Sequence, residues 1–405
     1  MKKPKIRFKG YQEDWEQRKL VDLVDRVTRK NQDLVSELPL TISAQYGLID
    51  QNEFFDKRVA SKDVSGYYLI ENGEFAYNKS TSTDAPWGAI KRLDRYKNGV
   101  LSTLYIVFGI KENNPVDSDF LVSYYSTNLW HKGIHEIAAE GARNHGLLNI
   151  APADFFETKL MIPQDIEEQK KIGKYFEELE RLITLHQRKC EETKTLKKYM
   201  LQKMFPQNGH SVPEIRFSGF TEDWEQRKFS ELYARSSEKN DGSIGMDKNI
   251  TVATMQFRND VRVSTTEYLK TYYTFKLGDI AFEGHQSKEF RYGRFVENDI
   301  GNGIVSHIFA VFRPIQEYDL YFWKYAINNE TLMQRILARS TKASTMMHDL
   351  VTNDFLNETF LVPSVTEQKQ IGTLLNNLDH LITLHQHKCE ELQNIKKFML
   401  KNMFI

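Results

Sequence analysis

In two stretches of the chain, the residues expected to be buried recur at alternating spacings of four and three positions. The first stretch runs from Ile172 to Met204 and the second from Ile371 to Met403. This spacing puts one side chain per turn on a single helical face, so each stretch predicts a helix about 55 Å long that packs against another helix. A short connection follows the first helix. We therefore expect an antiparallel pair, which would place the intervening blocks at opposite ends, with a parallel pair as the alternative.

The two blocks that precede these helices show a different pattern. Residues 67–77 (YYLIENGEFAY) match 272–282 (YYTFKLGDIAF), and residues 102–108 (STLYIVF) match 306–312 (SHIFAVF). Aromatic and β-branched runs beside glycine turns are typical of strands. The following segments, 119–140 and 319–340, have helical patterns. Each block is therefore predicted to be an α+β domain, and the two blocks are predicted to share one fold with diverged loops.

The chain is an internal repeat whose parts have diverged unequally. Residues 4–23 return at 213–232 with about 13 of 20 positions identical, and residues 169–205 return at 368–404 with about 21 of 37 identical. The blocks between them have largely drifted apart. A constant frame around two variable blocks indicates one scaffold that presents two different recognition surfaces.

Composition is compatible with several functions. The 405 residues are 40% hydrophobic and carry no net charge, and the mean hydropathy is −0.54. No long apolar run predicts a membrane span, so we expect no membrane association. The only cysteines, Cys190 and Cys389, occupy equivalent helix positions. Two cysteines in a chain of this length favour a reducing, cytoplasmic location and a packing role.

No recognisable catalytic motif stands out. Glycine-rich phosphate loops, paired zinc-type cysteines and the adenine-methyltransferase tetrapeptide are absent. Asp279, Glu283 and Lys288 lack the spacing of a metal-dependent nuclease, and Asp279 aligns with Glu74, which favours a structural role. His186 and His385 occupy matching slots of the helix stripe, where a polar layer that fixes register is favoured over a metal pair. We predict that the chain performs no chemistry alone.

Basic and amide side chains gather at two equivalent places in the blocks. Arginine, lysine, asparagine, glutamine and histidine contact base edges and phosphates, whereas a single such residue is often only a solvated charge. Both clusters follow the first strand-turn of their block and recur before its last strand, with different residues in each copy. The candidate DNA-binding residues are Lys79, Ser80, Lys91, Arg92, Arg143, Asn144 and His145 in the first block, and His285, Gln286, Lys288, Arg291, Arg294 and Lys342 in the second.

The repeated EDWEQRK box (13–19 and 222–228) admits two interpretations. Trp15 and Trp224 are expected to anchor the box onto the body of the protein, and the charges around them are typical of a solvated face. Because the box is duplicated, it could also form two equivalent docking surfaces. The candidate docking residues are Trp15, Arg18, Trp224 and Arg227.

Three groups of motifs together resemble the specificity subunit of type I restriction-modification systems. They are the EDWEQRKL box, the block-final segments KLMIPQDIEEQKKIG and TFLVPSVTEQKQIG, and the helices ITLHQRKCEE and ITLHQHKCEE that end in KMF and NMF. The resemblance covers essentially the whole chain. It implies two target-recognition domains, related by pseudo-two-fold repetition and separated by two long helices, that read an asymmetric, bipartite DNA sequence.

The resemblance also implies the domain order and the partners. We expect a first target-recognition domain at 1–165, a spacer helix at 166–206, a second target-recognition domain at 207–365 and a second spacer helix at 366–405. The expected partners are double-stranded DNA, two methyltransferase subunits that use S-adenosylmethionine and restriction subunits that use ATP and magnesium, with no cofactor on this chain. The alternatives are a coiled-coil adaptor that does not bind DNA, and a self-sufficient methyltransferase or nuclease with an unrecognised site.

Overall fold

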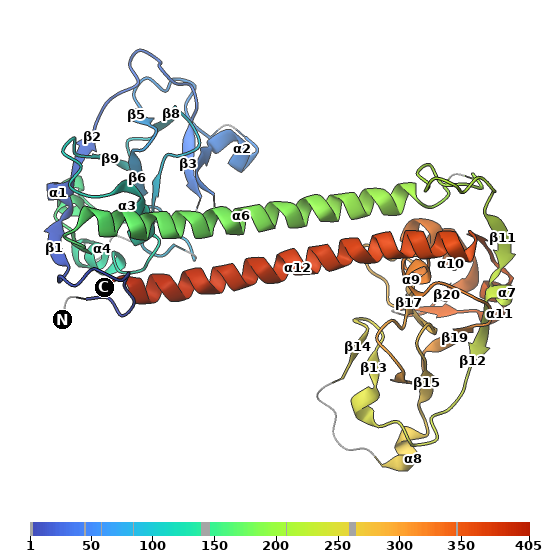
Figure 1. The fold of residues 1–405 in the computed structure, drawn as a ribbon. Coiled ribbons are helices and arrows are strands. Elements are labelled where there is room, and N and C mark those ends of the chain that lie inside the picture. The colour runs from blue at the N-terminus through green and yellow to red at the C-terminus, as the bar shows by residue number, and fades with distance from the viewer. Residues whose placement is uncertain are drawn as a thin grey trace. The chain divides into compact units, whose positions relative to one another are not determined.

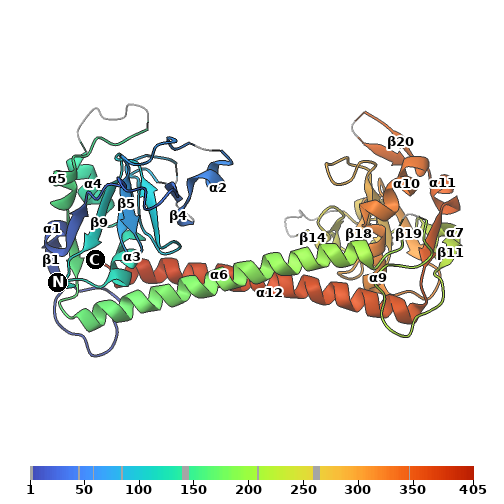
Figure 2. The same ribbon diagram turned by 90° about the horizontal axis from the view of Figure 1, so that it is seen from above.

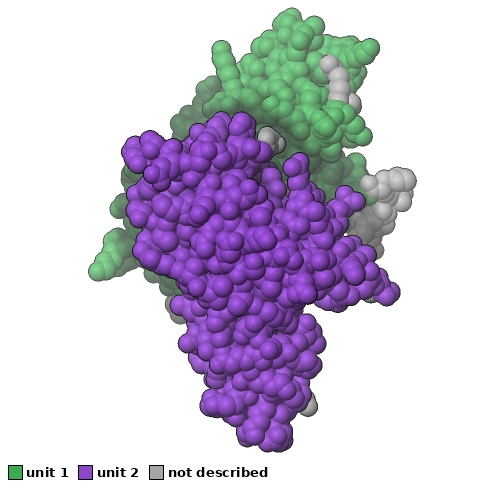
Figure 3. Space-filling model, turned by 90° about the vertical axis from the view of Figure 1, so that its right-hand side faces the viewer, with its two compact units in different colours: residues 1–186, 387–405 green, residues 187–386 purple. Residues whose placement is uncertain are grey.

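The computed structural model describes residues 3–43, 46–57, 59–83, 85–138, 146–207, 209–258, 265–345 and 347–405. The chain forms two compact units, which Figure 3 colours separately. Unit 1 comprises residues 1–186 and 387–405, and unit 2 comprises residues 187–386. Each unit therefore contains one variable block and a part of both long helices. The compact units thus cut through both helices, whereas the boundaries proposed from the sequence separate each helix from the block before it.

Unit 1 is an α+β domain built on antiparallel strands (Figure 1). Its principal sheet has the order β2-β9-β6-β7, and three two-stranded sheets pair β1 with β10, β3 with β4, and β5 with β8. Its elements are β1 (Glu16–Lys19), α1 (Leu20–Leu23), β2 (Val24–Val27), β3 (Leu40–Ser43), β4 (Gly47–Asp50), α2 (Gln51–Phe55), β5 (Tyr68–Glu71), β6 (Phe75–Asn78), β7 (Ala89–Arg92), β8 (Asn98–Leu101), β9 (Ile106–Ile110), α3 (Ser118–Tyr125), α4 (His131–Ile137), α5 (Pro152–Phe156), β10 (Lys159–Ile162) and the first part of α6 (Ile166–Lys203).

Unit 2 repeats this arrangement. Its principal sheet, β12-β19-β16-β17, has the same order, and β11-β22, β13-β14 and β15-β18 reproduce the small sheets, while β20 pairs with β21. Its elements are β11 (Glu225–Lys228), α7 (Phe229–Leu232), β12 (Tyr233–Ser236), η1 (Met246–Lys248), β13 (Ile250–Thr251), β14 (Gln256–Phe257), α8 (Thr266–Leu269), β15 (Tyr273–Phe275), β16 (Ile280–Glu283), β17 (Arg294–Glu297), β18 (Gly303–Val305), β19 (Ala310–Pro314), α9 (Leu320–Ile327), α10 (Glu330–Ser340), β20 (Thr341–Ala343), β21 (His348–Leu350), α11 (Thr352–Asn357), β22 (Thr359–Val362) and the first part of α12 (Val365–Met403). The predicted α+β fold class and the shared fold of the two blocks are confirmed.

Both principal sheets use the same strand register. Phe75 lies opposite Arg92 in unit 1, and Ile280 lies opposite Glu297 in unit 2. The turn into each middle strand contains a glycine with positive φ, Gly73 at +88° and Gly278 at +85°, which glycine adopts without steric cost. The offset of 205 between equivalent residues in this part of the chain allows the two units to be compared side chain by side chain.

The long helices form an antiparallel pair within each unit. In unit 1, the beginning of α6 packs against the end of α12: Ile172 and Phe176 share a core with Met403 and Phe404. In unit 2, the end of α6 packs against the beginning of α12, since Met204 and Phe205 share a core with Ile371 and Leu375. Helix α6 has 38 residues and α12 has 39. The predicted stripe is therefore buried at both ends of each helix, and the predicted antiparallel packing is confirmed.

The repeated tryptophans anchor the box as predicted. Trp15 is 1% exposed and lies edge-on to Phe404, while Trp224 is 3% exposed and lies edge-on to Phe205. These two phenylalanines end the KMF and NMF segments, so the end of each helix is fixed against the box of the unit in which it terminates. The EQRK residues of each box form β1 and β11, which pair with β10 and β22.

A pair of buried ionic contacts explains why the start of each helix was copied so closely. Arg7 binds the Glu168 carboxylate through two hydrogen bonds of 2.6 and 2.8 Å, and Arg216 binds Glu367 through two of 2.7 and 2.8 Å. Both carboxylates are about 1% exposed. A buried carboxylate needs such a bidentate partner. We call residues 4–23 and 213–232, which contain the boxes, together with the two long helices the frame, because the contacts described above recur in both units.

The next glutamine of each helix completes this frame. Gln169 accepts from the Asp117 backbone N–H and donates to the Pro163 carbonyl, and Gln368 makes the same two contacts with Asp319 and Pro363. Each of these aspartates is the N-cap of a helix, α3 or α9, that packs beside the first turns of α6 or α12 in its unit (Figures 1 and 2). The helix start is thus joined to the block and to the segment just before the helix at one point in each unit.

Candidate nucleic-acid interface

In each unit, the loop that follows one inner strand of the principal sheet (β6 or β16) is hydrogen-bonded to the segment that precedes α5 or α11. In unit 1, the Thr81 N–H donates to the Gly146 carbonyl at 2.7 Å and the Leu148 N–H donates to the Lys79 carbonyl at 3.0 Å. In unit 2, the His348 N–H donates to the Gly284 carbonyl at 2.8 Å. The two segments proposed separately from the sequence therefore form one surface per unit. We call it the recognition edge: residues 79–83, 85–88 and 146–150 in unit 1, and 284–293, 341–345 and 347–350 in unit 2.

Each loop is pinned at its return into the sheet. Gly88 has φ +78°, and an added Cβ would lie 2.2 Å from the Asn78 carbonyl oxygen; Gly293 has φ +81°, and an added Cβ would lie 2.6 Å from that of Glu283. Only glycine accommodates both the conformation and the close approach. The loops thus leave and re-enter the sheet at fixed points, and their intervening side chains are free to differ.

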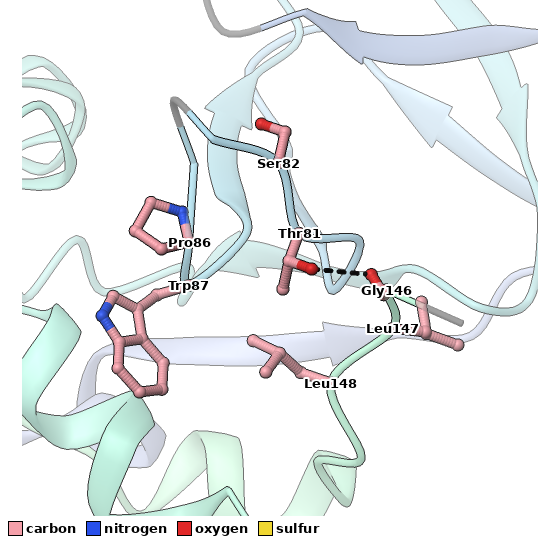
Figure 4. Close-up of a pocket in the computed structure, with 7 residues that line it drawn as sticks. All are labelled: Thr81, Ser82, Pro86, Trp87, Gly146, Leu147 and Leu148. Carbon is pink, nitrogen blue, oxygen red and sulfur yellow. Dashed lines mark hydrogen bonds between the residues drawn. The ribbon is translucent and has the colours of Figure 1, made fainter. Parts of the chain in front are cut away.

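The recognition edge of unit 1 contains a largely apolar pocket, shown in Figure 4. Its volume is about 280 Å³. The indole of Trp87 and the side chain of Leu148 form one side, and Thr81 donates its hydroxyl to the Gly146 carbonyl at 3.0 Å on the other. The lining residues are Thr81, Ser82, Pro86, Trp87, Gly146, Leu147 and Leu148.

Unit 2 places polar chemistry at the equivalent position. The paired residues Ser80 and Leu147 of unit 1 correspond to His285 and Met347 of unit 2, so His348 stands where unit 1 has Leu148. Its Nδ1 lies 2.8 Å from Gln286 Nε2, and its ring lies edge-on to Tyr292. The same site is therefore hydrophobic in one unit and an imidazole–amide pair in the other.

Most of the predicted DNA-binding residues of unit 2 are exposed on this edge. His285, Gln286, Lys288 and Arg291 lie on the loop, and Lys342 lies on β20 opposite Asp349. In unit 1, Ser80 is exposed, while Lys79 is half-buried and its Nζ lies 3.5 Å from the Ile150 carbonyl. Burial lowers the pKa of Lys79. Arg143, Asn144 and His145 lie outside the described residues.

Three predicted DNA-binding residues lie on strands and not in the loops, and their side chains are largely engaged within the chain. Arg92 on β7 is ion-paired with Asp94 at 2.6 Å and with Asp119 at 2.7 Å. Lys91, its neighbour, is half-buried, and burial together with the charge of Lys396 lowers its pKa. Arg294 on β17 donates to Glu283 at 2.7 Å and to the Ala253 carbonyl at 2.8 Å. Both guanidinium groups are thus occupied within the chain, which the local sequence could not show.

The acidic residues considered for a nuclease site have structural partners. Asp279 is 1% exposed and receives two hydrogen bonds of 2.9 Å from Arg313, and Glu283 is paired with Arg294. Among the described residues, no group of three or more His, Cys, Asp or Glu side chains is placed to hold a metal ion. The structural interpretation of Asp279 is confirmed.

The proposed docking box also needs a correction. Because Trp15 and Trp224 are buried, neither indole is available to a partner. Arg18 and Arg227 remain partly exposed, beside Asp22 and Glu231 respectively, with side-chain exposures of 35% and 29%. The tryptophans belong to the core, and only the arginines remain candidates for contact.

An exposed apolar surface that is duplicated on the two helices was not among the sites predicted from the sequence. Leu196 and Tyr199 on α6 are 43% and 46% exposed, and the equivalent Ile395 and Phe398 on α12 are 36% and 58% exposed. Residues three apart share a helix face. These positions fall outside the four-three stripe, yet both copies keep apolar residues there. This repetition is the feature of the sequence from which the surface could have been predicted. We call these two residue pairs the apolar stripes.

A family model for the type I restriction modification DNA specificity domain matches residues 12–195 and again 221–394. The chain belongs to this family. The two matches include both EDWEQRK boxes, both blocks and the greater part of both long helices, so the duplication seen in the sequence is a duplication of this domain.

Known proteins are similar over nearly the whole length. The type I restriction enzyme MjaVIII specificity subunit of Methanocaldococcus jannaschii is 22% identical over 403 residues, which span 95% of this chain and 91% of that protein. The crystal structure of the type I restriction-modification system S subunit from M. genitalium matches with a TM-score of 0.59 and 14% identity, covering 100% of this chain and 99% of that one. That of the HsdS subunit from Thermoanaerobacter tengcongensis matches with a TM-score of 0.45 and 17% identity, covering 97% of each chain. The match to the S subunit from M. genitalium shows that the two chains share a fold.

None of the described helices is long and apolar enough to cross a membrane.

Proposed function

We propose that this chain is the specificity subunit of a type I restriction-modification complex and that each recognition edge reads one half of an asymmetric, bipartite DNA target. The observation that carries the proposal is the contrast at the equivalent position of the two edges. Trp87 and Leu148 form an apolar wall in one unit, whereas His348 and Gln286 present polar groups in the other. Apolar contacts suit a thymine methyl group, and paired donors and acceptors suit other base edges.

A pair of unlike recognition domains on one chain avoids the symmetry of a homodimer. A homodimeric DNA-binding protein presents the same side chains twice and selects a palindrome. Here the frames are alike and the edges differ, so the two half-sites are expected to differ. The chain would thereby recognise a non-palindromic sequence without a second gene product for recognition.

The apolar stripes support recruitment of two copies of one partner. Exposed apolar pairs at equivalent places of both helices are the kind of surface that a protein partner covers. We propose that two methyltransferase subunits bind here, with S-adenosylmethionine on those subunits, and that restriction subunits bring ATP and magnesium. The chain itself then needs no cofactor and no catalytic residue, and acts in the cytoplasm, where DNA and these cofactors meet.

The proposal is tested by measuring DNA affinity of the chain assembled with its methyltransferase partner, as a function of salt. Replacing Lys288 and Arg291 together by alanine removes two exposed cations from the unit 2 edge. We expect weaker binding and a salt slope shallower by roughly one to two, because each lost phosphate contact lowers the slope by about one. Lys132→Ala, at a side chain 86% exposed on α4 and outside the edge, is the control and should change neither quantity.

Three other results would contradict the proposal. An unchanged affinity and slope in the double variant would remove the unit 2 edge from the interface. Failure of the complete assembly to bind any DNA would favour the adaptor function. Methylation or cleavage by the purified chain alone, with S-adenosylmethionine or a metal ion, would show a catalytic site within it.

A further inference from the structure

Unit 2 contains a cavity of about 810 Å³ between the long helices and the principal sheet. Lys197 of α6 and Asp379 of α12 lie on the helix side, and Val296 and Glu297 of β17 lie on the sheet side. Glu330, at the first turn of α10, lies at a further wall. All of the lining residues belong to unit 2, so the cavity is a property of this unit alone.

Glu297 is a buried acid in this cavity without a partner. Its residue is 2% exposed, and neither carboxylate oxygen has a hydrogen-bond partner among the described residues. Burial raises the pKa of its carboxyl group, and the negative charges of Asp299 and Asp319 raise that pKa further. The Oε2 atom of Glu330 is likewise buried and unpartnered. Buried polar groups without partners are costly and uncommon in native proteins, so each calls for an explanation.

Two of the lysines that line the cavity are ion-paired with other acids. Lys324 Nζ lies 2.6 Å from Asp299 Oδ2. Lys197 Nζ lies 2.6 Å from Asp379 Oδ1, and the other oxygen of this carboxylate accepts the Tyr325 hydroxyl at 2.6 Å. Both lysines are therefore ion-paired with acids other than Glu297 and Glu330, and the charge of Lys324 only partly offsets the rise in the pKa of Glu297.

Unit 1 shows what occupies the same place in the other copy. Through the shared register, Val296 corresponds to Lys91 and Glu297 corresponds to Arg92. The ion pair between Lys396 and Glu180 in unit 1 corresponds to that between Lys197 and Asp379 in unit 2. Lys91 is close enough to this pair for both charges to act on its pKa. Unit 1 thus places the ammonium of its own side chain beside the helix ion pair, where unit 2 has a short apolar residue and a cavity.

We propose that the cavity of unit 2 binds a linear aliphatic polyamine, whose ammonium groups pair with Glu297 and Glu330 and occupy the place that Lys91 fills in unit 1. The walls suit the whole molecule and not only its charges. Leu201, Met255 and Ile300 also line the cavity, and apolar surface of this kind packs against the methylene segments that separate ammonium groups. A bound divalent metal is disfavoured, because no group of three metal-ligating side chains occurs among the described residues.

The test uses the purified full-length chain without DNA and measures binding of spermidine, putrescine and magnesium chloride by calorimetry at one fixed ionic strength. We expect spermidine to bind saturably with one site per chain and to raise the melting temperature. Glu297→Gln should weaken binding about tenfold or more, since a buried charged hydrogen bond is lost. Val296→Lys, which introduces the cation of unit 1, should abolish binding.

Glu267→Gln is the matched control, because Glu267 lies in the same unit with a side chain 83% exposed and should leave the affinity unchanged. Equal weakening in the Glu267 and Glu297 variants would reduce the effect to general attraction between opposite charges and would overturn the proposal. Absence of saturable spermidine binding in the wild-type chain would overturn it as well, and so would magnesium binding of equal strength at the cavity. Circular dichroism checks whether the Val296 variant folds. If the Val296 variant does not fold, the affinity of the Glu297 variant for spermidine tests the proposal.

Discussion

The frame makes the same buried contacts in both units, whereas the recognition edges of the two units contain different side chains and make different contacts. Arg7 with Glu168 and Arg216 with Glu367 form the same bidentate pair at nearly the same distances. At the edges, the wall that is Leu148 in unit 1 is His348 in unit 2. The difference shows which parts of the two copies have stayed alike: the buried charges and the helix starts, and not the loops.

The principal sheets show a third behaviour, in which the contact is kept but its charges are rearranged. In unit 1, Arg29 reaches Glu74 at the turn into β6. In unit 2, the residue equivalent to Arg29 is Glu238, and Arg313 on β19 now binds both Glu238 and Asp279. An ion pair fixes this turn in each unit, although its cation follows β2 in unit 1 and lies on β19 in unit 2. Equivalence in the fold therefore does not require identity of residues.

The largest effect on stability is expected when the buried ion pair of the frame is broken in each unit. Arg7→Met and Arg216→Met each leave a carboxylate buried without its partner, which typically costs about 3–5 kcal/mol. We expect losses of that order and of similar size in both units, measured by chemical denaturation.

Arg181→Met is the control for this pair of variants, because Arg181 makes an ion pair with Glu178 on the exposed face of α6. Its substitution should cost far less stability than either frame variant, because solvent screens an exposed ion pair. A frame variant that behaves like this control would show that the conserved pair contributes little and that its retention has another cause.

A smaller effect is expected from the glycines that bring the helices close to α3 and α9. A Cβ at Gly173 would lie 2.7 Å from the Phe120 backbone nitrogen, and one at Gly372 would lie 2.6 Å from that of Phe322. We expect Gly173→Ala and Gly372→Ala to destabilise the chain by about 1–3 kcal/mol through overpacking. In an exposed helix the same substitution stabilises by about 1 kcal/mol, so a gain in melting temperature in either variant would contradict the tight packing.

The smallest expected effect concerns stability in acid and arises in the principal sheet of unit 2. Hydrogen bonds from Arg313, then from Lys276, lower the pKa of Glu238 to about 2. A carboxyl group with a lowered pKa in the folded state stabilises the fold above its ordinary pKa near 4.5, and this contribution is lost as pH falls toward 2. Solvent screens the contact, since the side chain is 45% exposed.

The check is the change in denaturation midpoint between pH 5 and pH 3. Glu238→Gln lacks the titrating group, so its midpoint should fall slightly less than that of the wild-type chain. Identical falls in the two proteins would show that this contact does not contribute to acid sensitivity.

The parts of the fold that repeat with a fixed period were accessible from the sequence. The four-three spacing of Ile172, Phe176 and Leu179 correctly gave the buried helix stripe, because a helix face recurs every 3.6 residues. The strands on either side of Gly73 and Gly278 were equally accessible, since glycine at such turns is demanded by local backbone geometry.

The candidate site was less accessible, because a charged residue does not reveal its partner. Arg92 and Arg291 look alike in sequence, yet Arg92 is neutralised by Asp119, which is distant along the chain, and Arg291 is exposed. The burial of Trp15 against Phe404 likewise depends on the far end of the chain. Tertiary contacts of this kind decide whether a side chain is structural or free to bind.

The central claim is that each recognition edge determines one half of the DNA target independently. The direct measurement is single-molecule sequencing of methylated adenines in cells that carry the methyltransferase partner and a chain whose residues 28–162 have been replaced by the matching block of another family member. The account predicts that one half of the methylated motif changes and the other half stays the same. A change in both halves, or in neither, would contradict it.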